Sequence, residues 1–73
     1  MVPLLPLRQY RERHSLSRQQ LGEILGVSRV TVARWETGER RIDQGYLALV
    51  ATKTGIPPAA LRPDLAKLLR VSV

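Results

Sequence analysis

The chain has 73 residues and a mass of 8.2 kDa, which allows one small domain. It contains no Cys, which excludes disulfides and thiolate metal sites, and its 44% of hydrophobic residues excludes a disordered chain. Twelve Lys and Arg against six Asp and Glu leave a net charge of +6, which favours a polyanionic partner, with nucleic acid ahead of a membrane surface.

The helical signals are dense and the strand signals are nearly absent. The first predicted helix begins at Pro6, because proline suits the first turn of a helix. The predicted helical ranges, in chain order, are 6–14, 17–25, 28–36, 43–54, 57–61 and 63–69. The sequence therefore predicts an all-α protein, a compact bundle of about five short helices that forms a single domain over residues 1–73.

The ends of the predicted helices carry recognisable chemistry. At three helix starts a small polar N-cap follows an apolar residue and precedes another apolar residue by four positions, and these caps are Ser17, Ser28 and Asp43. Gln20 follows Ser17 by three positions and completes a capping box. The same three helices end at residues that can adopt the left-handed conformation, namely Gly26, Gly38 and Gly55.

The second and third predicted helices are separated only by Gly26 and Val27, so they must cross steeply rather than lie antiparallel. Gly22 faces this crossing and removes side-chain bulk where the third helix approaches. The residues predicted to fill the wedge between the two helices are Leu21, Leu25, Val27, Val32 and Trp35. This arrangement is a helix-turn-helix.

The third predicted helix has two different faces. At about 100° per residue, Val32 and Trp35 share the inner face. The outer face consists of Arg29, Val30, Ala33 and Arg34. Such a face can enter a major groove, where two guanidiniums meet base edges and Val30 touches a thymine methyl group.

A family resemblance is carried by residues 7–38, LRQYRERHSLSRQQLGEILGVSRVTVARWETG. This segment resembles the phage repressor and Cro type (XRE-like) of helix-turn-helix DNA-binding domain, with its Leu-Ser cap, the Leu-Gly-Val-Ser turn and the Trp-Glu ending. Looser similarity extends through the fourth helix, and IPPAALRPDL is similar to the tail of small Cro-like antitoxin and prophage regulators. The resemblance implies a lambda repressor-like fold.

The resemblance also implies roles for particular residues. Arg29, Val30 and Arg34 stand where the family reads bases. The positions near the family's phosphate contacts are Ser17, Arg18, Thr31, Thr37, Arg40 and Arg41. Arg11 and Glu36 match positions that form an ion pair between helices in some members.

Two positions depart from the family pattern. Many members have Gln where this chain has Arg18, which exchanges an oriented amide contact for a more salt-sensitive phosphate contact. Many have Ala where this chain has Gly22. Because Gly costs about 0.8 to 1.0 kcal/mol relative to Ala within a helix, we expect Gly22 to loosen the helix crossing.

These features predict a sequence-specific transcriptional regulator that binds double-stranded DNA with residues 28–36 in the major groove. One module contacts few bases, so we expect a homodimer on an inverted-repeat operator with half-sites about 34 to 36 Å apart. The predicted dimerisation tail is the segment 61–73. The apolar residues that favour it are Leu65, Leu68, Leu69, Val71 and Val73.

The competing prediction is a protein-interaction module, such as an antitoxin or a regulatory adaptor, whose helix-turn-helix meets another protein. The positive outer face argues against that reading, although the apolar tail leaves room for a protein partner in addition to DNA. A steep loss of duplex affinity with salt distinguishes a nucleic-acid binder from this alternative.

The sequence offers no catalytic arrangement. Ser17 and Ser28 are explained as N-caps, His14 has no carboxylate at metal-ligand spacing, and no Gly-rich phosphate loop is present. We therefore expect neither enzymatic activity nor a cofactor or metal. No apolar run approaches the roughly 18 residues of a membrane span, and Pro3 and Pro6 interrupt the one signal-like segment, so we expect a cytoplasmic protein.

Overall fold

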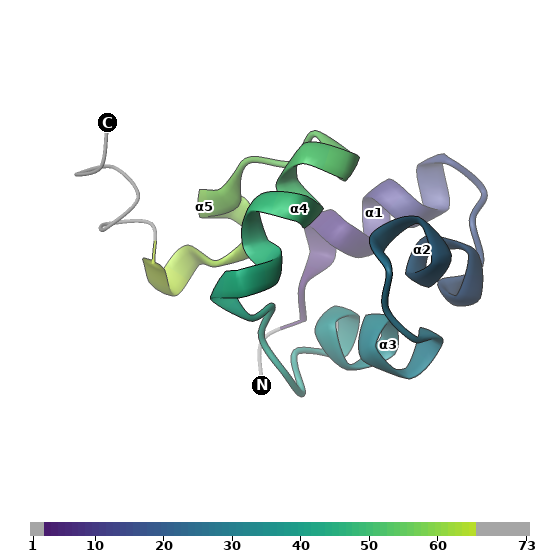
Figure 1. Cartoon of the computed structure of the whole chain (residues 1–73), viewed down its shortest axis with the longest axis horizontal. Helices are drawn as coiled ribbons and strands as arrows, with labels where there is room; N and C mark the ends of the chain where they lie inside the picture. Colours follow the sequence, from purple (N-terminus) through teal and green to yellow (C-terminus); the bar gives the residue numbers. More distant parts are fainter. Residues whose placement is uncertain (1–2, 66–73) are drawn as a thin grey trace.

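The computed structural model describes residues 3–65, which form five α-helices and a final 3-10 turn (Figure 1). These elements are α1 (Leu5–Arg13), α2 (Arg18–Leu25), α3 (Arg29–Thr37), α4 (Gln44–Thr54), α5 (Pro58–Leu61) and η1 (Pro63–Leu65). Residues 3–65 contain no strand, and the predicted all-α fold is confirmed. Pro63 begins a 3-10 turn rather than an α-helix, and the rest of the predicted helix to Leu69 lies outside the described residues.

The predicted caps are present, with one correction. Ser17 and Gln20 form the capping box, with 3.0 Å from the Gln20 N–H to the Ser17 hydroxyl and 2.8 Å from the Ser17 N–H to the Gln20 amide oxygen. Ser28 accepts from the Thr31 N–H at 3.2 Å. Asp43 occupies the N-cap position of α4, but its carboxylate accepts no capping hydrogen bond.

The exposed Asp43 carboxylate is not needed as an acceptor, because the N–H of Tyr46 already donates to the Asp43 backbone carbonyl at 2.9 Å. Its charge still interacts favourably with the start of α4. The three predicted left-handed glycines at the helix ends are confirmed. The C-cap residues of α2, α3 and α4 have φ values of 75°, 82° and 75°, and they are Gly26, Gly38 and Gly55.

The core draws on every α-helix and on the loop before α4. Its buried hydrophobic residues are Leu7, Leu21, Leu25, Val32, Trp35, Ile42, Leu47, Val50 and Leu61. Val27 is half-buried against this core, so the wedge predicted between α2 and α3 is confirmed. Leu61, where the predicted dimerisation tail begins, is 2% exposed, so its side chain is enclosed by its own domain.

The rest of the predicted tail divides into two parts. Leu65 is half-buried against the core, and residues 66–73 lie outside the described part of the chain. None of the helices within residues 3–65 combines the length and the apolar character that crossing a membrane requires.

The crossing of α2 and α3 depends on Gly22. A Cβ atom at this position would lie 2.5 Å from the carbonyl oxygen of Val27, in the turn that leads into α3. The Gly22 carbonyl in turn accepts a hydrogen bond from the Val27 N–H at 2.8 Å. The expectation that glycine loosens the crossing is therefore wrong, because the backbones meet too closely to admit a methyl group.

Candidate nucleic-acid interface

Helix α3 separates its buried and exposed residues as predicted. Val32 and Trp35 are 0% and 3% exposed, and they anchor the inner face in the core. On the outer face Val30 is 50% exposed, and Figure 1 shows α3 along one edge of the molecule with α1, α2 and α4 to one side of it. The structure thus brings the four predicted base-reading residues onto one accessible surface of a nine-residue helix.

The side chains of this outer face differ in accessibility. Arg29 and Arg34 are exposed, and Ala33 is half-buried between them. Within residues 3–65 neither of the two guanidiniums is paired with a carboxylate. The face therefore offers two free cations beside a small side chain, which lets a helix approach the floor of a groove.

The predicted phosphate contacts flank α3 on both sides. Ser17 and Arg18 lie at the start of α2, Thr31 lies in the first turn of α3, Thr37 is its last residue, and Arg40 and Arg41 follow it. The Thr37 hydroxyl donates to the Arg34 carbonyl at 3.2 Å, which ties it to the last turn of α3. Arg40 and Arg41 are exposed in the loop between α3 and α4.

An open cleft of about 260 Å³ lies beside α3 at the start of α4. Its lining residues are Gly26, Val27, Ser28, Thr31, Arg34, Trp35, Arg40, Asp43 and Tyr46. Besides one carboxylate, two arginines and three residues with hydroxyl groups line the cleft, and guanidinium and hydroxyl groups commonly bind phosphate oxygens. The cleft extends the positively charged surface from α3 to the following loop.

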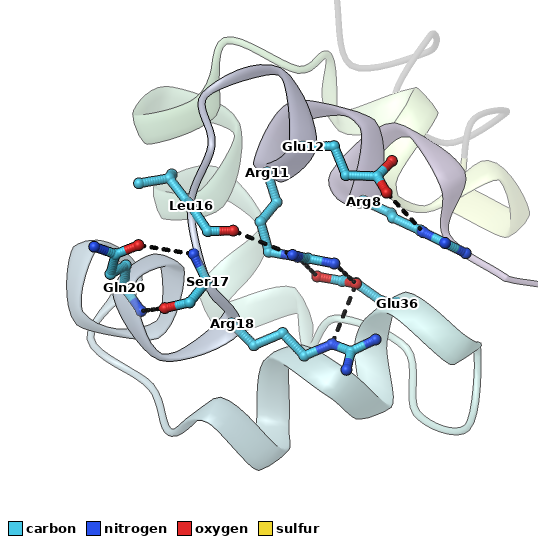
Figure 2. Close-up of polar contacts among 8 residues, drawn as sticks. All are labelled: Arg8, Arg11, Glu12, Leu16, Ser17, Arg18, Gln20 and Glu36. Carbon is cyan, nitrogen blue, oxygen red and sulfur yellow. Dashed lines mark hydrogen bonds and ion pairs between the residues drawn. The ribbon is translucent and has the colours of Figure 1, made fainter.

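The carboxylate of Glu36, at the end of α3, is held by two arginines. Arg11 approaches it with Nε at 2.7 Å and Nη2 at 3.1 Å, as expected from the family resemblance. Nη1 of Arg11 also donates to the Leu16 carbonyl at 3.1 Å. Figure 2 shows Arg18 reaching the same carboxylate from α2, with Nε 3.5 Å from Oε1. Nothing in the sequence indicated this second pairing of Arg18.

Burial makes the Glu36 cluster important for α3. The Glu36 side chain is 2% exposed and that of Arg11 is 16% exposed, so the pair is largely removed from water. The hydrogen bond to Glu36 raises the pKa of the Arg11 guanidinium above its usual value. The Glu36 backbone carbonyl accepts from the Leu4 N–H at 2.9 Å. The end of α3 is therefore fixed to α1 by side-chain and backbone contacts.

A second arginine cluster, absent from the sequence predictions, holds the loop between α3 and α4. Arg62 donates to the Ile42 carbonyl at 2.6 Å, and two of its nitrogens contact the Asp64 carboxylate at 2.8 and 3.0 Å. Arg41 lies 3.5 Å from the same carboxylate. The Arg62-Pro63-Asp64 spacing is a local signal for the pairing of Arg62 with Asp64. The contact of Arg62 with Ile42, however, joins residues 20 positions apart.

The hydrogen bonds from Arg62 lower the pKa of Asp64 from its ordinary value of 3.8 to about 2. Because the folded pKa is the lower one, the pairing stabilises the fold above pH 3.8 and is lost as the pH falls towards 2. Replacing Arg62 with Gln should move the titration midpoint of Asp64 back towards 3.8, which a carboxyl ¹³C NMR titration measures. A wild-type midpoint already at the ordinary value would contradict the pairing.

The remaining candidate for a catalytic or metal-binding side chain in the described region is His14. His14 is the C-cap residue of α1, and its ring lies 4.3 Å from that of Tyr10. Residues 3–65 contain no cluster of three or more His, Asp or Glu side chains that could hold a metal ion.

Comparisons with known proteins identify the family. Neither the curated proteins nor the solved structures yielded a significant match. A family profile described as helix-turn-helix matches residues 7–61, from α1 through α5. This match covers both the crossing of α2 and α3 and the helices that support it. The chain therefore belongs to the helix-turn-helix family, and it is an XRE/Cro-like DNA-binding transcription regulator.

Proposed function

We propose that the protein recognises a specific sequence in double-stranded DNA by placing α3 in the major groove. Arg29, Val30, Ala33 and Arg34 read base edges. Ser17, Arg18, Thr31, Thr37, Arg40 and Arg41 contact phosphates on either side. The observation that carries this proposal is the exposed outer face of α3, with Val30 half exposed between two guanidiniums and the opposite face buried in the core.

The proposal includes a homodimer on an inverted-repeat operator. A nine-residue helix such as α3 reaches few base pairs, which leaves one module with little discrimination. Two modules related by a two-fold axis meet successive major grooves about 34 to 36 Å apart. Selecting preferred sites from a random DNA pool tests both points. We expect a palindromic site, and a pool without any enriched sequence would refute sequence-specific recognition.

A protein partner is the second candidate, and one observation favours it. Tyr46 and Leu49 lie one turn apart on α4 and are 40% and 41% exposed, so apolar surface remains available there. Titration with a random duplex at several salt concentrations separates the two candidates. DNA binding predicts that log affinity falls linearly with log salt, with a slope near −0.9 for each phosphate neutralised. A flat dependence would favour the protein partner.

Replacing Arg34 with Ala should relax base preference, because a bidentate arginine contact provides about 1 to 3 kcal/mol of discrimination. Replacing Arg40 with Ala is the matched control, since this exposed arginine lies in the loop after α3. We expect the Arg40 variant to weaken all sequences alike and to reduce the salt slope by about 1. Binding curves on the selected site and on single-base variants measure both effects. Identical behaviour of the two variants would contradict the division of roles.

Val30 should contact the methyl group of a thymine, because its side chain stands half exposed at the centre of the outer face. Exchanging that thymine for uracil removes one methyl group, which is worth about 0.8 kcal/mol when buried. The exchange is tested at each thymine of the selected site in turn. Val30→Ala should abolish the difference between thymine and uracil, and equal affinity at every position in the wild type would exclude the contact.

A further inference from the structure

Two carboxylates, those of Glu36 and Asp64, are each contacted by two arginines. Each is bound closely by an inner arginine that is largely buried, and each is approached by an outer arginine at 3.5 Å. At Asp64 the inner residue is Arg62, whose side chain is 13% exposed, and the outer residue is Arg41, which is 72% exposed. Glu36 holds Arg11 and Arg18 in the same way.

The inner arginine determines what happens when the outer one leaves. Arg62 makes two contacts with Asp64, at 2.8 and 3.0 Å, and it also binds the Ile42 carbonyl. The Asp64 carboxylate therefore keeps its position and its main partner without Arg41. The contact between Arg41 and Asp64 is long and exposed, the kind of ion pair that contributes little to stability and that another anion readily replaces.

We propose that Asp64 competes with the DNA backbone for Arg41 and thereby lowers the affinity of the protein for every duplex. This inference rests on the proposed function, in which Arg41 contacts a phosphate. When Arg41 moves to a phosphate it gives up Asp64, and the carboxylate then stands near a second anion. Asp64 is thus a positioning residue that acts on DNA through the arginine beside it, while Arg62 fixes the carboxylate in place.

The test is a double-mutant cycle read out as duplex affinity over a range of salt concentrations. Asp64→Asn should bind a random duplex about 2- to 5-fold more tightly than the wild type, which is the range of exposed ion pairs. The gain should disappear when Arg41 is also replaced with Gln. Because Arg62 retains the Ile42 carbonyl, we expect the Asp64 variant to fold, and its thermal unfolding curve verifies this.

Glu39→Gln is the matched control for net charge, since Glu39 is exposed in the same loop and makes no ion pair within residues 3–65. Both variants remove one negative charge, but only Asp64 is paired with arginines, and the double variant with Arg41→Gln isolates the part of the gain that depends on Arg41. An equal gain in the two variants, a loss of affinity in Asp64→Asn, or a gain that persists with Arg41→Gln would each overturn the inference while leaving the proposed function intact.

A measurement on the wild type needs no variant. On addition of duplex, the ¹³C signal of the Asp64 carboxyl should shift as Arg41 leaves, and an unchanged signal in the bound complex would overturn the inference. If the wild type shows no salt-dependent affinity for duplex DNA at all, the proposed function fails, and the competition fails with it.

Discussion

Replacing Arg11 with Met should lower the free energy of unfolding by about 3 to 5 kcal/mol, because it leaves the buried Glu36 carboxylate without its main partner. Glu36 is 3% exposed, so water cannot substitute for the lost guanidinium. Arg18 remains 3.5 Å away and compensates only in part. Urea denaturation monitored by Trp35 fluorescence measures the loss, which is a large share of the stability of so small a domain.

The chain provides an internal control for this substitution. Arg8 and Glu12 form an exposed pair at 3.5 Å on α1, with both side chains more than half accessible (Figure 2). Arg8→Met removes the same charge and should cost less than about 1 kcal/mol. A similar cost in the two variants would show that burial of Glu36 does not determine the effect. Replacing Arg11 and Glu36 together with apolar residues should recover much of the lost stability.

Replacing Gly22 with Ala should cost about 3 kcal/mol, near the upper end for an overpacked site. The added methyl group would lie 2.5 Å from the Val27 carbonyl oxygen, and a backbone atom cannot move aside as a flexible side chain can. The turn into α3 must shift, so DNA affinity should fall together with stability. Thermal unfolding and duplex binding measure the two losses.

Gly45→Ala is the matched control, because Gly45 lies in the first turn of α4 with nothing within 4 Å of the position of a Cβ atom. There alanine should stabilise the protein by about 0.4 to 1 kcal/mol through the unfolded chain. If Gly22→Ala proved as stable as Gly45→Ala, the close approach of the two backbones would be refuted.

The features that sequence predicts well here are local ones. The capping box of Ser17 and Gln20, the Ser28 cap and the left-handed glycines all depend on residues three or four positions apart, which a linear pattern displays. The inner and outer faces of α3 follow from helical periodicity alone. The pairing of Arg11 with Glu36 came from the family resemblance, since its partners lie 25 residues apart.

The features that sequence missed depend on the packing of distant segments. The contact of Arg62 with the Ile42 carbonyl leaves no periodic trace across 20 residues, and Arg18 gave no sign of reaching Glu36. The burial of Leu61 was not predicted, because an apolar residue looks the same in a sequence whether its own domain or a partner covers it. Asp43 failed as a side-chain cap because a backbone carbonyl had already taken the donor it would have used.

Because Leu61 is buried in the core, it sets a minimum length for a fragment that folds on its own. A fragment that stopped after α3 or α4 would lose this side chain and leave a hole in the interior, at a cost of about 2 to 5 kcal/mol. It would also lose the contact by which Arg62 holds the loop between α3 and α4. A fusion protein that uses this DNA-binding domain must therefore carry an uninterrupted stretch from Leu4 to Asp64.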